Sequence, residues 1–399
     1  MRYGLPRRAR VALPLTASLL LLAGCDAASE AEAEAEAEPT PVETAAPEFT
    51  DADGEKPNIV ILDGGGTIVS TAEGPADYTH YGDESLDGIQ DVLDRISPEI
   101  DEVANLEIVD GAIPGVSSTT TVEQLFEMTR QLDGIMADDE VDGVVVNTGT
   151  NIMEEISYWA DLTVRSDKPL VFTGSMRQAN TFSFDGEANL FNAIRVAASG
   201  ETRCFGAVQL LNDEFVAARE VTKTDAWRTD TFSGGRYGAL GTVDGDNVRT
   251  VRAPARVLDC GTEEWATPFD LSTVDVDDLA QVEIVYSYVE ADATPIEALA
   301  EAGVDGIVTA GHGAGGISAA QSEAREAAIA DDDVLFANTT RTGSGSIYDD
   351  GTEGVLPGYD LTPQKARVLL QLALTFSDDE DQIRDWFTTI GAPEFNGVE

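Results

Sequence analysis

Residues 62–71, LDGGGTIVST, place three consecutive glycines and a hydroxyl side chain shortly after the apolar run 59–62. Glycines let the backbone turn sharply and leave room for another group to approach closely. Open α/β sheets bind their ligands just beyond the carboxyl ends of buried strands. The pattern therefore predicts a buried strand that ends at the glycines, with Thr67 as a candidate site residue immediately after it. The alternative interpretation is a tight strand-to-helix turn with no chemical role.

Further apolar runs end in small or polar residues and alternate with helical patterns. The predicted strands are 58–62, 143–146, 170–172, 282–286, 306–308 and 334–336. The predicted helices are 121–132, 153–164, 187–198, 295–302, 319–330 and 363–376, with one more after residue 378. Short, continuously apolar strands between helices are typical of a mostly parallel α/β sheet. We therefore expect an α/β fold: a larger, mostly parallel domain over 57–251, a linker over 252–280 and a smaller parallel α/β domain over 281–399.

The N-terminus is typical of an exported protein. Residues 1–24 combine a basic front with an apolar run that is too short to span a bilayer comfortably, as in a secretory signal peptide. This segment ends LAGC, which resembles the lipobox of bacterial lipoproteins and implies a lipidated Cys25. Residues 25–56 predict an acidic, disordered tether. We expect an exported, membrane-anchored lipoprotein, periplasmic or on the cell surface; an ordinary signal peptide or an uncleaved anchor is the alternative.

The charge balance narrows the classes of partner. The chain has 74 acidic and 24 basic residues, and its formal net charge is −50. Such a surface argues against a nucleic-acid partner, because phosphate binding needs a basic face. The excess of like charge favours a protein adapted to saline surroundings, since salt weakens the repulsion; the alternative is acidity that only aids solubility.

Cysteine and histidine counts limit the metal chemistry. Apart from Cys25, the chain has only Cys204 and Cys260, so at most one disulfide can form in the folded part, and its only histidines are His80 and His312. These counts argue against a structural zinc site, and we expect no metal.

Several motifs in order resemble the bacterial-type L-asparaginase/glutaminase family over nearly all of the expected mature chain. They are GGGT at 64–67, TGTNIMEE at 148–155, TGSMRQANTFSFDGEANLFNAI at 173–194, EVTKTD at 220–225 and LTPQKARVLLQLAL at 361–374. The resemblance implies an amidohydrolase (EC 3.5.1.1) that cleaves the side-chain amide of L-asparagine, with L-glutamine as a second candidate substrate, to release ammonia. It also implies no metal or organic cofactor, and a homotetramer built from two dimers with active sites between subunits.

The resemblance assigns catalytic roles residue by residue. It implies that Thr67 is the nucleophile, assisted by a tyrosine on a mobile loop, for which we choose Tyr78 with Tyr81 as the alternative. Thr150 becomes the second essential hydroxyl, and Lys223 the group that eases movement of its proton. A hydroxyl needs such partners because a neutral alcohol is a poor nucleophile.

Three serines are expected to bind substrate. Ser175 matches the family position near the substrate amide. Ser117 and Ser118 resemble the pair that grips the substrate α-carboxylate.

One residue departs from the family pattern. Asn151 follows Thr150 where the family carries Asp, whose charge attracts the substrate α-ammonium. We include Asn151 among the substrate-binding residues, and its neutrality keeps open a catalytically weak or altered-specificity amino-acid-binding relative. The acidic residue that the family supplies across subunits is not assigned by the motifs; Asp350 and Glu353 are the candidates.

Overall fold

The structure is a computed structural model that describes residues 56–113 and 117–394, together with Pro47, Phe49 and Gly54. The expected signal peptide, Cys25 and most of the acidic tether lie outside the described residues, so these expectations stay predictions. The described residues all belong to one compact unit, Glu43–Glu399. Within them, no helix has the length and apolar character needed to cross a membrane.

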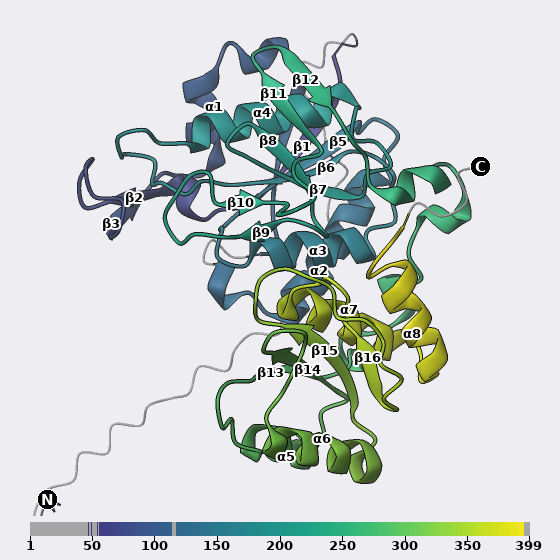
Figure 1. Ribbon diagram of the computed structural model, residues 1–399. Coiled ribbons are helices and arrows are strands. Elements are labelled where there is room, and N and C mark those ends of the chain that lie inside the picture. The colour runs from purple at the N-terminus through teal and green to yellow at the C-terminus, as the bar shows by residue number, and fades with distance from the viewer. Residues whose placement is uncertain (1–46, 48, 50–53, 55, 114–116, 395–399) are drawn as a thin grey trace, which may run out of the picture. The chain divides into compact units, whose positions relative to one another are not determined.

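An eight-stranded sheet forms the larger, N-terminal part of the fold (Figure 1). Its strand order is β12-β11-β8-β7-β6-β5-β1-β4, parallel from β4 to β7 and antiparallel from there to β12. The parallel strands are β4 (Asn105–Asp110), β1 (Asn58–Gly64), β5 (Gly143–Thr148), β6 (Leu170–Thr173) and β7 (Ala207–Leu211). The antiparallel strands are β8 (Glu214–Ala217), β11 (Gly241–Asp244) and β12 (Asn247–Thr250).

Helices cover both faces of this sheet, which explains why its central strands are apolar without alternation. On β1, Ile59 and Ile61 pack into the cluster that includes α1 (Ile89–Ile96) and α4 (Gly186–Ser199). Val60 and Leu62 point to the opposite cluster, with α2 (Val122–Met136) and α3 (Met153–Thr163). Both faces of β1 are therefore buried, and a ligand can approach the strand at its carboxyl end.

A smaller sheet of four parallel strands follows in the C-terminal part. It consists of β13 (Val282–Tyr286), β14 (Gly306–Gly311), β15 (Leu335–Thr340) and β16 (Val355–Pro357). The helices of this part are α5 (Thr294–Ala302), α6 (Ala319–Asp332), α7 (Pro363–Phe376) and α8 (Glu380–Thr389). Helix α7 contacts both α3 and β14, so one apolar core continues between the two sheets (Figure 1). The predicted fold class, a larger mostly parallel α/β domain followed by a smaller parallel one, is confirmed.

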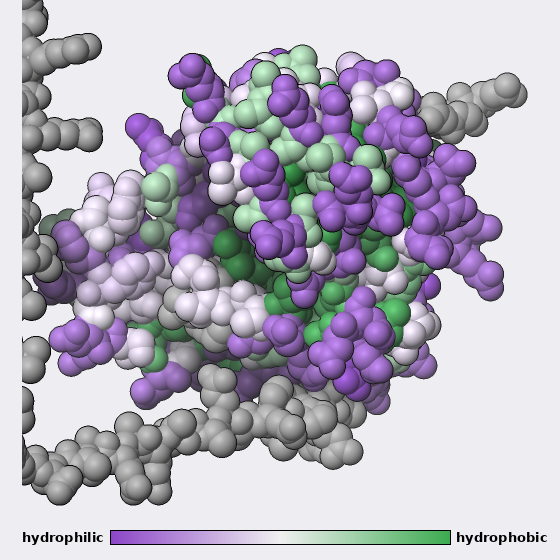
Figure 2. Space-filling model, turned by 90° about the horizontal axis from the view of Figure 1, so that it is seen from below, coloured by the Kyte–Doolittle hydropathy of each residue, from purple (hydrophilic) through white to green (hydrophobic). Residues whose placement is uncertain are grey.

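Two short hairpins and several 3₁₀ helices complete the described residues. The hairpins are β2 (Ser70–Ala72) with β3 (Tyr81–Ser85), and β9 (Thr222–Lys223) with β10 (Phe232–Ser233). The 3₁₀ helices are η1 (Thr67–Val69), η2 (Ile100–Glu102), η3 (Ser117–Thr119), η4 (Ala255–Asp259), η5 (Glu263–Trp265), η6 (Leu271–Thr273) and η7 (Val276–Asp278). Figure 2 shows one face of the molecule covered largely by hydrophilic side chains with smaller hydrophobic areas between them, as the excess of acidic residues leads us to expect.

Candidate active site

The glycine turn after β1 presses against the turn after β5. The two strands are parallel neighbours, with Gly64 opposite Thr148. Gly65 and Gly66 have φ angles of 63° and 94°, which favour glycine. A Cβ atom on Gly66 would lie 2.6 Å from Gly149 Cα, so no other residue fits there. The three-glycine run therefore allows two backbones to touch at the carboxyl edge of the sheet, where a ligand is expected.

Asp63 holds this turn in place. Its Oδ1 accepts hydrogen bonds from the Gly65 N–H and from Asn147 Nδ2, both at 2.8 Å, and its Oδ2 accepts from the Ile89 N–H at 3.2 Å. One carboxylate thus ties β1, β5 and the start of α1 together. The motif comparison assigned no role to Asp63; an acidic residue directly before three glycines is the signal that could have found it.

Thr67 lies at the start of η1 and is paired with a tyrosine hydroxyl. Its Oγ1 is 2.8 Å from the Tyr81 hydroxyl, and Thr67 itself is buried. Tyr81 begins β3, whereas Tyr78 lies in the hairpin loop with its ring 5.1 Å from the Arg177 guanidinium carbon. Of the two tyrosines considered from the sequence, the structure therefore brings Tyr81, the alternative, to the Thr67 hydroxyl.

Thr150 forms a second hydroxyl pair on the neighbouring turn. Lys223 Nζ, on β9, donates a hydrogen bond to Thr150 Oγ1 at 2.8 Å. Burial lowers the pKa of Lys223, and the nearby Glu154 carboxylate opposes that shift. The Thr222 hydroxyl donates to Glu154, which anchors the strand that carries Lys223. A lysine whose pKa is lowered by burial gives up its proton more readily than an exposed lysine does.

The turn after β6 lies beside these two and carries Ser175. A Cβ on Gly174 would lie 2.5 Å from the Thr148 carbonyl oxygen, which shows how tightly the turns pack. Ser175 is buried, and its hydroxyl donates to the Arg177 carbonyl at 2.7 Å. Asp185 accepts from the N–H groups of Met176 and Arg177, both at 2.9 Å, and burial raises the pKa of its carboxyl group. The buried Ser175 turn is thus fixed by a carboxylate that starts α4.

The remaining predicted substrate-binding residues are less defined. Asn151 is exposed beside the buried Thr150. Ser117 and Ser118 belong to η3, where Ser118 is exposed and the side chain of Ser117 lies outside the described residues. Their expected roles stay predictions.

A buried lysine from the C-terminal part supports the Lys223 strand. Lys365, on α7, is 1 % exposed and donates to the carbonyls of Ala218 at 2.7 Å and Arg219 at 2.9 Å, and also to that of Val221. Burial lowers the pKa of Lys365 to about 7. Lys365 lies inside the motif at 361–374, but its contact with the segment before Lys223 was not foreseen, because it joins residues more than 140 positions apart.

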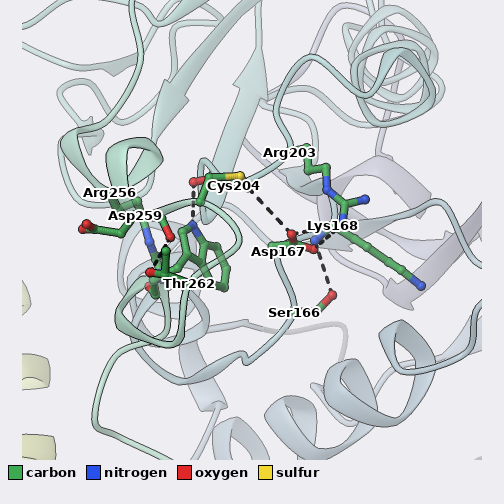
Figure 3. Close-up of a disulfide and its surroundings, with 10 residues drawn as sticks. Ser166, Asp167, Lys168, Arg203, Cys204, Arg256, Asp259 and Thr262 are labelled. Carbon is green, nitrogen blue, oxygen red and sulfur yellow. Dashed lines mark hydrogen bonds and ion pairs between the residues drawn. A yellow bond between two sulfur atoms is a disulfide. The ribbon is translucent and has the colours of Figure 1, made fainter.

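Among the residues that the structure describes, no cluster of side chains is suited to bind a metal ion. The one cluster of potential ligands is Asp167, Cys204 and Cys260, and the two cysteines form a disulfide (Figure 3). Sulfur atoms joined to each other are not available as thiolate ligands. A depression of about 530 Å³ lies elsewhere, lined in part by Phe191, Arg195 and Val243, and it contains none of the predicted site residues.

Taken together, the geometry has the arrangement expected of a hydrolytic site of the covalent-nucleophile class. Two buried hydroxyls, Thr67 and Thr150, each lie 2.8 Å from a hydrogen-bond partner, on turns whose backbones are in contact. A nucleophile and its activating group within hydrogen-bond reach are the signature of that class.

Comparisons with known proteins identify the family. The family model described as "Asparaginase, N-terminal" matches residues 58–256, and that described as "Glutaminase/Asparaginase C-terminal domain" matches residues 281–387. The chain is 33 % identical over 385 residues to L-asparaginase 2 of Bacillus subtilis, covering 96 % of this chain and 99 % of the relative. It is 31 % identical over 337 residues to the glutaminase-asparaginase of Acinetobacter glutaminasificans, covering 83 % and 99 %.

A solved structure gives the same result. A probable cytoplasmic L-asparaginase from Campylobacter jejuni matches with a TM-score of 0.76 at 31 % identity, over 84 % of this chain and 99 % of that one. The chain therefore belongs to the asparaginase family of amidohydrolases.

Proposed function

We propose that this protein hydrolyses the side-chain amide of L-asparagine to aspartate and ammonia, with L-glutamine as a possible second substrate. The relatives named L-asparaginase and glutaminase-asparaginase support the substrate class. The observation that carries the proposal is the pair of hydroxyl contacts, Thr67 with Tyr81 and Thr150 with Lys223, both at 2.8 Å.

In the proposed first step, Thr67 Oγ1 forms a bond to the amide carbon of the substrate. Its proton leaves through the hydrogen bond to Tyr81, and the amide nitrogen gains a proton as the C–N bond breaks. Ammonia departs and an ester to Thr67 remains. The developing oxyanion needs fixed donors, and backbone N–H groups in the tightly packed turns are suited to that task.

In the second step, water attacks the ester and restores the Thr67 hydroxyl. Thr150, with its proton passed toward Lys223, is placed to take a proton from that water. The lowered pKa of Lys223 favours the neutral amine that this transfer requires. Tyr78, our first choice from the sequence, is replaced by Tyr81 in this mechanism.

The weaker alternative is a protein that binds an amide or acidic amino acid with little turnover. The neutral, exposed Asn151 favours it, because the charge that attracts an α-ammonium is missing there. Calorimetric binding of L-aspartate without ammonia release from L-asparagine would support this alternative over the enzyme.

Export, lipid anchoring at Cys25 and a tetramer are part of the same proposal. The Cys204–Cys260 disulfide supports export, since such bonds persist mainly in oxidising compartments. The exposed apolar residues Ile284, Tyr286 and Val289, on and after β13, support subunit contacts in this part of the chain.

The proposal is tested by ammonia release from L-asparagine and L-glutamine. Replacing Thr67 with Val keeps its shape but removes the hydroxyl, so kcat/KM should fall by roughly 10³-fold or more. Thr242→Val, which removes a hydroxyl from β11 that bonds Asp244, is the matched control and should leave kcat/KM unchanged. Undiminished turnover in Thr67→Val would remove Thr67 from the mechanism.

A further inference from the structure

The hairpin that carries Tyr81 is not stable by itself. β2 and β3 are the two strands of a separate small sheet, and most of β3 is exposed. Isolated two-stranded hairpins are marginally stable in water. Contacts outside the hairpin must therefore hold Tyr81 against Thr67.

Asn180 makes the most specific of these contacts. Its Oδ1 accepts the Ala72 N–H at 2.8 Å, and its Nδ2 donates to the Ala72 carbonyl at 3.0 Å. Because one amide satisfies both backbone groups of a single residue, it fixes the position of that residue along the strand. Ala72 is the β2 residue directly opposite Tyr81.

Neighbouring residues extend this contact along the hairpin. The Ala179 N–H donates to the Ser70 carbonyl at 2.8 Å, and the Phe182 N–H donates to the Pro75 carbonyl at 2.7 Å. These residues belong to the segment that follows the Ser175 turn. The hairpin therefore rests on the same loop that presents Ser175.

We propose that Asn180 is a positioning residue that holds Tyr81 in hydrogen-bond contact with Thr67. The inference rests on the role given to Tyr81 in the proposed function. Asn180 does not touch the reacting atoms in this scheme; it acts by fixing Ala72, and through Ala72 the strand position of Tyr81.

Loss of the Asn180 amide should weaken catalysis more than folding. Asn180 is exposed, so Asn180→Ala leaves the core intact. It removes two hydrogen bonds from the hairpin, and each net hydrogen bond corresponds to about a fivefold change in an equilibrium. We expect kcat to fall by roughly 10- to 30-fold with a much smaller change in KM, because the substrate-binding turns remain in place.

A double-mutant cycle separates positioning from a general structural effect. Wild type, Asn180→Ala, Tyr81→Phe and the double variant are assayed for ammonia release from L-asparagine. Once the Tyr81 hydroxyl is absent, the position of the hairpin no longer affects catalysis. Asn180→Ala should therefore change kcat less than twofold in the Tyr81→Phe background. Asn192→Ala, which removes another exposed amide bound to Asp213, is the matched control.

Hairpin order gives a second readout. Chymotrypsin should cleave the 73–81 segment faster in Asn180→Ala than in wild type, while Tm stays the same. Equal losses of kcat in both Tyr81 backgrounds, or wild-type kcat and cleavage in Asn180→Ala, would overturn the inference while leaving the role of Tyr81 intact. Full activity in Tyr81→Phe would instead overturn that role, and the inference with it.

Discussion

Lys223 and Glu154 show how burial and charge compete at a single side chain. Burial lowers the pKa of Lys223 because the charged ammonium loses hydration, and the Glu154 carboxylate works in the opposite direction. The outcome is a lysine that stays within hydrogen-bond reach of Thr150 yet releases its proton more readily than an exposed one. This balance supports the proton-transfer role that we propose for Lys223.

The residue after Thr150 gives a direct test of charge in substrate binding. Asn151→Asp restores the carboxylate that the family carries, and a charged hydrogen bond to the substrate α-ammonium is about twice as strong as a neutral one. We expect kcat/KM for L-asparagine to rise by about 10-fold, mainly through KM. Steady-state ammonia release measures it.

Asn247→Asp is the matched control: it adds the same charge on β12 and should leave kcat/KM for L-asparagine unchanged. If both variants behave alike, the missing charge at Asn151 has no part in binding.

At the scale of elements, the segment after β12 is fixed to the larger domain by a disulfide, an ion pair and a hydrogen bond. We expected a linker over 252–280, and the structure shows η4 to η7 there. Cys260, which follows η4, forms the disulfide with Cys204 (Figure 3). Arg256 of η4 makes an ion pair with Asp161 at 2.9 Å. Trp265 Nε1 donates to the Cys204 carbonyl at 2.9 Å. The segment is therefore docked on α3 and on the loop between α4 and β7.

Removing the disulfide should lower stability without touching the chemistry. The bridged cysteines are 56 positions apart, and closing a loop of that length stabilises the folded state by up to about 4 kcal/mol in the chain-entropy description. The variant Cys204→Ser with Cys260→Ser should therefore unfold at a lower urea concentration, with unchanged kcat.

Reductant should lower the urea midpoint of the wild type toward that of the double variant, and it should leave the midpoint of the double variant unchanged. Equal urea midpoints for oxidised wild type and double variant would contradict this account.

Elements were predictable where their signal was local. The strands β1, β5, β6, β13, β14 and β15 and the helices α2 to α7 follow from continuous apolar runs and from helical periodicity, and each lies within a few residues of its expected range, whereas β4 and β7 were not predicted. Helix α1 has only eight residues and β9 has two. Both elements are too short to show a clear hydrophobic periodicity. The strands β8, β11 and β12 pair antiparallel at one edge, and their pairing depends on partners that a local pattern does not specify.

For the whole molecule, the dominant long-range term is its own charge. The net charge is −50, so acidic groups repel one another and destabilise the compact state at low salt. Salt weakens this repulsion, because the Debye length falls from about 10 Å at 0.1 M to about 3 Å at 1 M. We expect Tm to rise by roughly 5 °C or more as NaCl increases from 0.1 to 1 M. Differential scanning calorimetry measures it.

The shape of the salt dependence distinguishes screening from general salt exclusion. Screening acts mostly below 1 M, whereas exclusion of salt from the surface keeps growing above it. A Tm that is flat to 1 M and rises only beyond that would show that charge repulsion does not limit stability.

The sequence by itself determined the α/β class, the glycine turn after β1 and the candidacy of Thr67, Thr150 and Lys223. The fold class and the turn depend on neighbours in the chain, because apolar runs bury strands and glycine alone tolerates the contact between Gly66 and Gly149. Thr150 and Lys223 became candidates through the motifs that resemble the family. Only the tertiary structure decided that Tyr81 rather than Tyr78 meets Thr67, and that Lys365 supports the strand of Lys223. Those contacts depend on hairpin register and on packing between distant segments, which no local pattern encodes.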